Sequence, residues 1–241
     1  MTALAVRPMA TTLRVLGALL TYPDARLRGH LQEMRRLLPE EGALGPARLG
    51  EVDALAAALL GADALDAEAA YVELFDRGRA TSLHLFEHVH GDSRDRGPAM
   101  VDLARTYASA GLLLAEGELP DYLPAVVEFA STRPPREARA FLGETAHLLA
   151  AIYGALQERG SAYAGVLGAL LELAGEPVQA RRPPAEAPLD ESWAEPPAFD
   201  GCSTAGQSGP AARPGDPQPI RIVRDRRPAG PAANPPSGGS A

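Results

Sequence analysis

The densest run of chemically reactive side chains lies between residues 82 and 100. It reads Ser-Leu-His-Leu-Phe-Glu-His-Val-His-Gly-Asp-Ser-Arg-Asp-Arg-Gly-Pro-Ala-Met, with three histidines followed by alternating acids and arginines. A connector between two helices needs only a stop signal, a few polar residues and a start signal such as Gly97-Pro98. The surplus of polar side chains therefore predicts either a ligand-facing surface or a cluster of ion pairs that fixes helix ends. The first alternative is open because loops often carry the functional residues of a protein.

Residues 84–88 match the inverted zinc-protease pattern H-x-x-E-H. On one face of a helix, imidazoles at i and i+4 bind zinc while the glutamate activates water, so a zinc-dependent hydrolase is one hypothesis. Such a site needs a third protein ligand, for which the downstream candidates are His147, Glu144 and Glu128. The alternative interpretation places His84 on a helix face and His88 and His90 in a polar cluster without metal.

Composition narrows the classes of protein to which the chain can belong. None of its 23 basic residues is a lysine. This excludes a Walker-type phosphate loop and Schiff-base chemistry, because both need a lysine amine. The formal net charge of −8 argues against a nucleic-acid partner, since a nucleic-acid binder must neutralise phosphates with a basic face. An acidic protein suits a cationic partner better, although charge alone also serves solubility.

Cysteine usage and hydropathy favour a cytoplasmic protein without direct membrane insertion. Cys202 is the only cysteine, so neither an internal disulfide nor a thiolate-rich metal site is expected. The apolar run at 15–20 is short, ends at Tyr22-Pro23 and lacks a small-residue cleavage site, which favours a core helix over a signal peptide. No segment reaches the ~20 apolar residues that cross a bilayer.

The hydrophobic pattern up to residue 175 is helical, with no sustained alternation typical of a strand. Helix starts and stops are predicted from capping residues and prolines. The expected helices are one capped by Thr11 or Thr12 and ending before Pro23, one from Asp24 to Pro39, one over about 46–60, one opened by Asp66 and running through Phe75, one from Pro98 to near Gly117, one capped by Asp121 and stopped by Arg133-Pro134-Pro135, one carrying Phe141, Thr145, Leu148, Ile152 and Leu156, and one through Tyr163, Val166, Leu170 and Leu173. The predicted fold class is all-α, a single bundle of about eight helices.

The composition changes at about residue 176, where proline, glycine and serine become frequent. Such a segment buries too little apolar surface to offset its ordering entropy, so 176–241 is predicted to be a disordered tail behind a helical domain at 1–175. Two apolar islands interrupt it. Residues 193–199 are a candidate docking patch, and residues 220–223 are either a stray strand or a short binding motif.

Three ordered blocks of this sequence resemble one known family. Residues 86–103 closely resemble the signature of the NarJ-type nitrate reductase molybdenum cofactor assembly chaperones, residues 118–124 resemble that family's second motif, and residues 193–199 resemble its C-terminal one. The likeness covers roughly 10–200. In the wider TorD/DmsD redox-enzyme maturation group the second motif usually reads E-P-x-D-H. Here Glu118 and Asp121 match it, whereas Leu119 and Tyr122 replace the proline and the histidine.

The resemblance implies a cytoplasmic, all-helical chaperone with no catalytic activity and no cofactor of its own. Its implied partner is the molybdenum-containing catalytic (alpha) subunit of nitrate reductase, including the N-terminal segment of that subunit, which it would hold until the molybdenum cofactor is inserted. The residues expected to bind the client peptide are Glu87, His88, His90, Asp92, Arg94, Asp95, Arg96, Glu118, Asp121 and Tyr122. We expect an amphipathic basic helix to enter an apolar groove rimmed by these acids. The alternatives are the zinc hydrolase, a chaperone of another molybdoenzyme, and a structural subunit of the mature complex.

Overall fold

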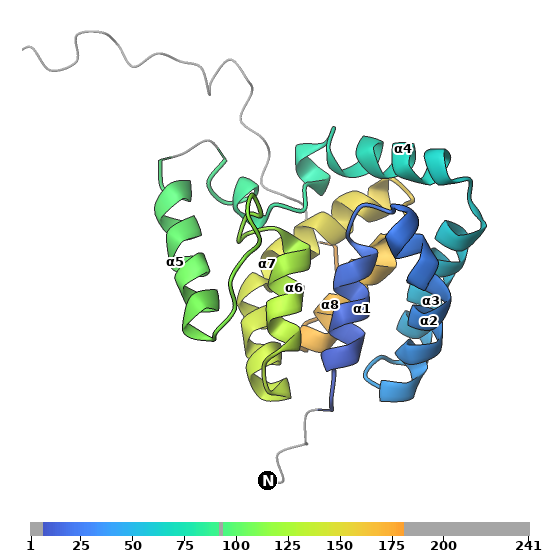
Figure 1. Cartoon of the computed structure of the whole chain (residues 1–241), viewed down its shortest axis with the longest axis horizontal. Coiled ribbons are helices and arrows are strands. Elements are labelled where there is room, and N and C mark those ends of the chain that lie inside the picture. Colours follow the sequence, from blue (N-terminus) through green and yellow to red (C-terminus); the bar gives the residue numbers. More distant parts are fainter. Residues whose placement is uncertain (1–6, 92–93, 181–241) are drawn as a thin grey trace, which may run out of the picture. The chain divides into compact units, whose positions relative to one another are not determined.

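The computed structural model describes residues 7–91 and 94–180 of the chain. Within those residues the backbone forms eight α-helices and two short 3-10 turns, and it forms no strand. Their bounds are α1 Ala10–Leu19, α2 Ala25–Glu41, α3 Pro46–Gly61, α4 Ala64–Phe75, η1 Arg79–Thr81, η2 Leu85–Glu87, α5 Arg96–Ser109, α6 Leu123–Ser131, α7 Pro135–Glu158 and α8 Ala164–Ala174. The all-α prediction is confirmed (Figure 1).

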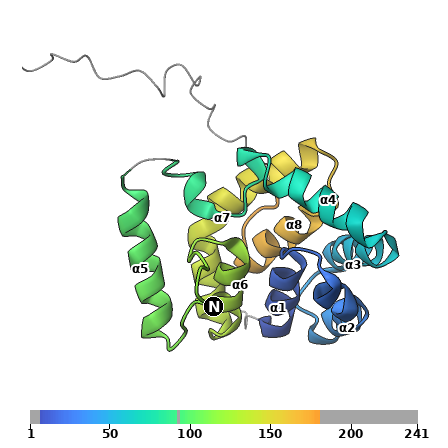
Figure 2. The ribbon, with the colours of Figure 1, turned by 45° about the horizontal axis from the view of Figure 1, so that its top comes forward.

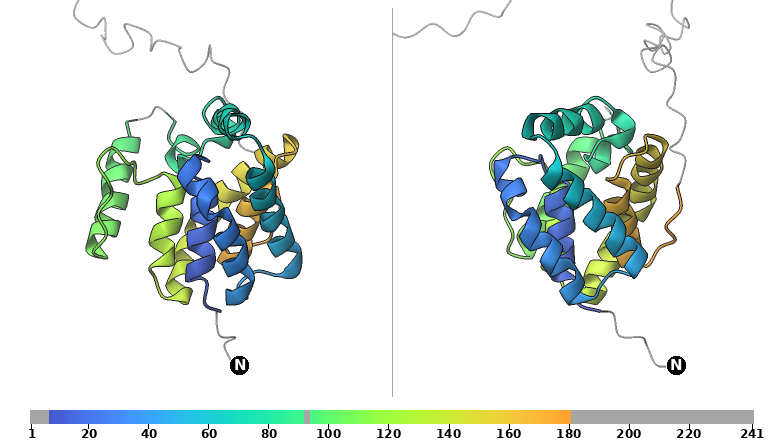
Figure 3. Two further views of the ribbon diagram at one scale, coloured as in Figure 1. Left: turned by 45° about the vertical axis from the view of Figure 1, so that its right-hand side comes forward. Right: turned by 90° about the vertical axis from the view of Figure 1, so that its right-hand side faces the viewer.

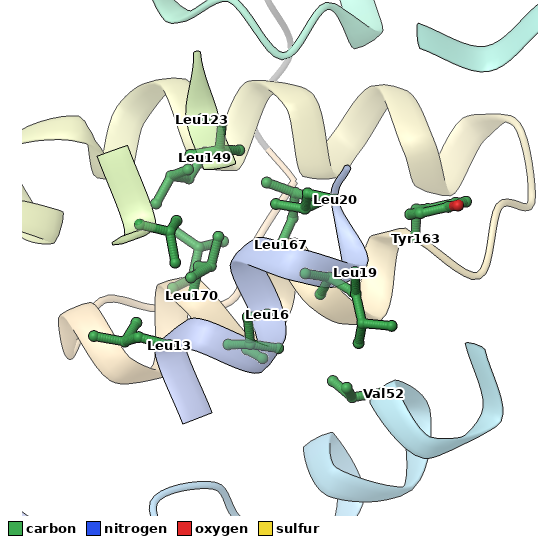
Figure 4. Packing of buried hydrophobic residues seen from close by; sticks show 14 of the residues in the cluster. Leu13, Leu16, Leu19, Leu20, Val52, Leu123, Leu149, Tyr163, Leu167 and Leu170 are labelled. Atoms are coloured by element: carbon green, nitrogen blue, oxygen red, sulfur yellow. The ribbon is translucent and has the colours of Figure 1, made fainter. Parts of the chain in front are cut away.

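The core is built around α1, which packs against α2 on one side and α6 on the other, while α8 lies between α1 and α7. Figure 2 shows this order clearly. Leu13 and Leu16 of α1 point into the same interior as Leu167 and Leu170 of α8 (Figure 4), and all four are fully buried. Helices α7 and α8 are antiparallel neighbours joined by a short turn, and their apolar faces are buried mainly against each other, with α3 also packing on α8 and α6 on α7.

The strongest helical period in the sequence, from Phe141 to Leu156, lies in α7 as expected. Leu148, Ile152 and Leu156 are buried in the main core, and Phe141 packs against its edge. The helix begins at Pro135, because proline at the first helical position sacrifices no hydrogen bond.

The N-terminus of α1 is capped by a residue that the sequence analysis did not identify. Neither Thr11 nor Thr12 is the cap, because both already lie inside the helix. The carboxylate of Glu41, at the end of α2, instead accepts hydrogen bonds from the backbone N–H groups of Thr12 at 2.7 Å and Thr11 at 3.2 Å. A carboxylate at this end also interacts favourably with the helix dipole. The predicted cap by Thr11 or Thr12 is therefore wrong, and a side chain from another helix caps α1 instead.

Two further helix boundaries differ from the prediction. Helix α2 is capped by Asp24 as expected, but it continues past Pro39 and ends at Gly42, which has the left-handed conformation that glycine favours. Pro39 lies in the last turn, where its missing N–H removes a single intrahelical bond. Helix α4 is capped by Asp63 rather than opened by Asp66. Asp66 instead occupies the first turn, where an acid also favours the helix N-terminus.

Helix α5 is shorter than predicted, because it ends at Ser109 and not near Gly117. Gly111 has a positive φ of 80° directly after it, and the chain then runs irregularly to α6. The left view of Figure 3 shows α5 at the edge of the bundle from a further side.

The last helix ends at Ala174, followed by Gly175 in the left-handed region. This is where the predicted helical domain ends. The candidate patch at 193–199, Cys202 and the island at 220–223 lie outside the described residues. The boundary between a domain at 1–175 and a tail at 176–241 stays a prediction. In the described ranges, no helix combines the length and apolar character that crossing a bilayer requires.

Candidate functional site

The backbone brings the two predicted motifs together. An isolated antiparallel bridge pairs His84 with Tyr122. The Leu85 N–H donates to the carbonyl oxygen of Asp121 at 3.0 Å, and the Leu123 N–H donates to the carbonyl oxygen of Leu83 at 2.8 Å. The first signature loop, residues 82–91, and the second, residues 118–122, therefore form one site at the N-terminus of α6.

Asp121 is the centre of this site and is fully buried. Its Oδ2 accepts a hydrogen bond from the Phe86 N–H at 3.1 Å and lies 3.7 Å from the guanidinium of Arg96. Its Oδ1 lies 3.5 Å from Nδ1 of His84. The expected capping role is wrong: Tyr122 occupies the N-cap position of α6, and no side chain caps it. The carboxylate instead faces the other loop, because the partly buried backbone N–H of Phe86 needs an acceptor.

Glu87 makes a second link between the first loop and α5. Its Oε2 accepts a hydrogen bond from the Ser82 hydroxyl at 2.5 Å, and its Oε1 lies 3.5 Å from the Arg96 guanidinium. The ring nitrogen Nε2 of His88 lies 2.8 Å from the carbonyl oxygen of Ser82 and donates to it. Arg96 thus joins Glu87 and Asp121 in an ion-pair cluster at the start of α5. The alternative interpretation of this stretch, a ligand-facing surface, stays a prediction.

Four more of the predicted client-binding residues lie in the same two segments or just before α5. His90 packs its ring edge to face against Phe86, with centroids 5.6 Å apart. Arg94 and Asp95 are exposed just before α5, and Asp95 holds its N-cap position. Glu118 is exposed and accepts a hydrogen bond from the Ala115 N–H at 3.3 Å. Asp92 lies outside the described residues, so the structure places nine of the ten.

Tyr122 is half-buried and connects the site to the helical core. Its hydroxyl lies 3.4 Å from that of Tyr71, which donates to the carbonyl oxygen of Leu20 at 2.7 Å. Burial raises the pKa of both hydroxyls, so both stay protonated at neutral pH. The sequence offered no sign of this contact, since Tyr71 has the spacing of an ordinary core residue in α4.

His84 also belongs to this site, although the sequence analysis did not place it among the client-binding residues. Its ring lies over that of Tyr122 with centroids 5.2 Å apart, and its side chain is one-third exposed. The adjacent Asp121 carboxylate raises the pKa of His84 above its ordinary value, with Glu87 acting in the same direction while partial burial and Arg96 oppose them.

The zinc hypothesis loses its geometric basis. Residues 84–88 do not form an α-helix: His84 precedes a 3-10 turn, and His88 follows it. His84 faces the Asp121 carboxylate and His88 donates to a backbone carbonyl oxygen, so the two imidazoles do not share a helical face. Among the described residues, no group of three or more histidine, cysteine, aspartate and glutamate side chains is placed to hold a metal ion.

A surface pocket of about 390 Å³ opens between α3, α7 and α8. Glu51, Tyr153 and Ser161 contribute to its wall, and none of its lining residues belongs to either signature loop. The apolar surface beside the loops comes from α5 and its flanks instead.

Comparisons with known proteins identify the family in which these two loops occur. The family model described as nitrate reductase delta subunit matches residues 43–168, which include both loops. The nitrate reductase molybdenum cofactor assembly chaperone NarJ of Escherichia coli K12 is 47% identical over 160 residues, covering 66% of this chain and 68% of NarJ. The chain belongs to this family. The resemblance seen in the sequence motifs is thereby confirmed.

One more relative and one solved structure are also similar to the chain. The probable nitrate reductase molybdenum cofactor assembly chaperone NarW of Escherichia coli K12 is 42% identical over 163 residues, covering 68% of each chain. A putative redox enzyme maturation protein from Archaeoglobus fulgidus is a structural neighbour with a TM-score of 0.49 and 20% identity, covering 73% of this chain and all of the other. The names of NarJ and NarW describe assembly chaperones and not enzymes.

Proposed function

We propose that this chain is an assembly chaperone of nitrate reductase, which holds the apo form of the catalytic subunit while the molybdenum cofactor is inserted. The observation that carries the proposal is the 47% identity to a named chaperone of that kind over 160 residues. The chaperone acts in the cytoplasm, where the client folds, and performs no bond-making chemistry. Release follows from the folding of the client around its cofactor, because folding removes the binding-competent form by mass action.

The client segment recognised at the signature loops is the N-terminal segment of the catalytic subunit. Glu118 is exposed at the edge of the site, whereas Glu87 is half-buried there beside Ser82 and Arg96. We therefore place the basic side chains of the peptide against Glu118, with Glu87 adding negative charge behind it. Charges at the edge of an interface mainly steer and orient the partner, while apolar contacts supply most of the affinity. The buried Asp121 acts differently: it positions the two loops, so that its neighbours face the peptide.

Calorimetric titration of the full chain with a synthetic N-terminal peptide of the catalytic subunit tests this proposal. A Glu87→Gln/Glu118→Gln double variant is expected to bind the peptide at least fivefold more weakly, with a smaller dependence on salt. The matched control removes two exposed acids of α2, Glu33 and Glu40, and is expected to bind as the unmodified chain does.

Three outcomes are informative. Equal binding by both double variants would exclude the two loop acids from recognition. Binding of the intact catalytic subunit without binding of the peptide would place recognition elsewhere on the client. Tighter binding to the corresponding peptide of another molybdoenzyme would identify that enzyme as the client instead.

A further inference from the structure

Two arginines contact the segment around the first signature loop from outside that loop. Arg79 lies in η1, a few residues before the loop, and Arg159 directly follows the last residue of α7. Both residues are exposed. Among the described residues, the hydrogen-bond acceptors of both guanidiniums are carbonyl and hydroxyl oxygens and not carboxylates. We call Arg79 and Arg159 the arginine pair.

Arg159 connects η1 to the C-terminal end of α7. Its Nη1 donates to the Thr81 hydroxyl at 2.9 Å and to the carbonyl oxygen of Leu74 at 3.2 Å. Thr81 is fully buried in η1, and Leu74 lies in the last turn of α4, where carbonyl groups have no partner within the helix. A Cβ on Gly78 would lie 2.7 Å from Nη2 of Arg159, so the glycine leaves the room that the guanidinium occupies.

Arg79 extends this connection into the loop. Its Nη2 donates to the carbonyl oxygen of Glu87 at 3.4 Å. The same nitrogen lies over Gly91, where an added Cβ would clash with it. Gly91 has a φ of 51°, in the left-handed region that glycine favours. Two glycines thus each lie against one guanidinium of the arginine pair.

The end of the loop has few other contacts that could fix it. The backbone N–H groups of residues 88–90 donate to carbonyl oxygens of residues 85 and 86, earlier in the same loop. A segment that depends mainly on its own hydrogen bonds opens at a low free-energy cost, whereas contacts with the rest of the domain raise that cost. Three of the predicted client-binding residues, Glu87, His88 and His90, lie in this part of the loop.

We infer that Arg79 and Arg159 are positioning residues for client recognition. They act in series: Arg159 attaches η1 to α7, and Arg79 attaches the end of the first signature loop to η1. The loop therefore keeps one geometry before the client arrives, which lowers the ordering cost of binding. This inference rests on the proposed function, and it assigns the arginine pair a role in the free chain and not a contact with the client.

The test compares Arg79→Ala with Arg77→Ala in the full chain. Arg77 is the matched control, because it lies two residues away, is exposed and pairs with Glu73 of α4. Affinity is measured by titration with the cofactor-free catalytic subunit. Arg79→Ala is expected to bind about fivefold more weakly, and Arg77→Ala within about twofold of the unmodified chain. Arg79→Lys keeps one cationic donor for the same carbonyl oxygen and is expected to restore most of the affinity.

Hydrogen exchange of the free chain supplies a readout that general destabilisation would not reproduce. Arg79→Ala is expected to speed exchange of the amides at 87–90 by about tenfold and to leave those of α1 and α8 unchanged. Because the arginine pair acts in series, the Arg79→Ala/Arg159→Ala double variant is expected to bind within about twofold of the weaker single variant.

The outcomes separate this inference from the proposed function. If the unmodified chain does not bind the cofactor-free subunit, the proposed function is wrong, whatever the exchange data show. If that binding occurs and Arg79→Ala changes neither affinity nor exchange at 87–90, the positioning role is wrong. Weaker binding without faster exchange in the free chain would assign Arg79 to direct client contact and overturn the inference. It is also overturned if Arg79→Lys binds as weakly as Arg79→Ala, or if exchange speeds up equally throughout the domain.

Discussion

Replacing Asp121 with alanine is expected to destabilise the domain far more than replacing Glu118, although both acids belong to the same short motif. Asp121 is fully buried and accepts the Phe86 N–H, while Glu118 is exposed. The alanine variant removes the acceptor of a loop N–H and leaves the half-buried Arg96 with one carboxylate fewer. The substitution therefore weakens the contact between the two signature loops.

The size of the effect follows from these contacts. An unpaired buried N–H costs about 1–3 kcal/mol. Breaking a buried charge pair costs about 3–5 kcal/mol, an upper limit here because the Arg96 side chain is 25% exposed. We expect a loss of about 2–4 kcal/mol for Asp121→Ala, and a smaller loss for Asp121→Asn, whose amide oxygen still accepts the Phe86 N–H. Glu118→Ala is expected to change stability by about 0.5 kcal/mol or less.

Thermal unfolding followed by circular dichroism measures the difference. For a domain of this size, each kcal/mol corresponds to about 2–4 °C in Tm, so Asp121→Ala is expected to lower Tm by about 4–16 °C. The reasoning is refuted if Asp121→Ala and Glu118→Ala unfold at the same temperature.

The proximity of His84 to Asp121 predicts that the stability of the fold depends on pH. Because the pKa of His84 is raised in the folded state, chiefly by Asp121, the charged imidazole stabilises the fold. That contribution is complete below the ordinary histidine pKa of about 6.5 and disappears as the pH rises through the raised folded value. The stability difference between the unmodified chain and Asp121→Asn is therefore expected to be larger at acidic pH than at mildly alkaline pH. A difference that does not vary over that range contradicts the contact between His84 and Asp121.

Three further predictions address the scaffold that positions the site, each measured as a change in the free energy of unfolding. Tyr71→Phe removes a buried hydrogen bond and is expected to cost about 1 kcal/mol. Tyr163→Phe removes a buried hydroxyl that has no hydrogen-bond partner among the described residues, and it is expected to be neutral or stabilising; equal costs would contradict the hydrogen-bond assignment. Glu41→Ala is expected to cost about 1 kcal/mol, because it removes the cap of α1; no loss would mean that the helix is capped otherwise. Gly165→Ala places a Cβ 2.9 Å from the Cβ of Glu51 in α3 and is expected to cost about 1–3 kcal/mol. Gly143→Ala, with open space around it in α7, is expected to stabilise the fold by about 0.5–1 kcal/mol. If Gly143→Ala were the more destabilising variant, the close packing of α3 on α8 would be contradicted.

The helical architecture could be predicted from the sequence where its signals are local. The apolar period from Phe141 to Leu156, the cap at Asp24 and the proline pair before α7 each depend on residues a few positions apart. The same reasoning failed where the partner is distant in sequence. Glu41 caps α1, which begins 31 residues earlier, and no local sequence pattern predicts that the Glu41 carboxylate contacts the N-terminus of that helix.

The site shows the same division between local and distant signals. The two motifs were recognisable as polar segments with a shared family signature, and the structure joins them through one bridge. Asp121 had the pattern of a helix cap, yet its carboxylate turns to the other loop, because the Phe86 N–H and the Arg96 guanidinium lie there. The incomplete burial of Met100 and Leu103 in α5 could not be predicted either, since their spacing is that of an ordinary core-facing helix.

The claim that the chain is a chaperone of the apo catalytic subunit is tested most directly by comparing its binding to two forms of that subunit. The measurement is the amount of the full chain captured by the purified catalytic subunit, once without molybdenum cofactor and once fully loaded. The account predicts capture by the cofactor-free form and at least tenfold less by the loaded form. Equal capture by both forms at fixed stoichiometry would contradict it, because that is the behaviour of a structural subunit of the mature complex.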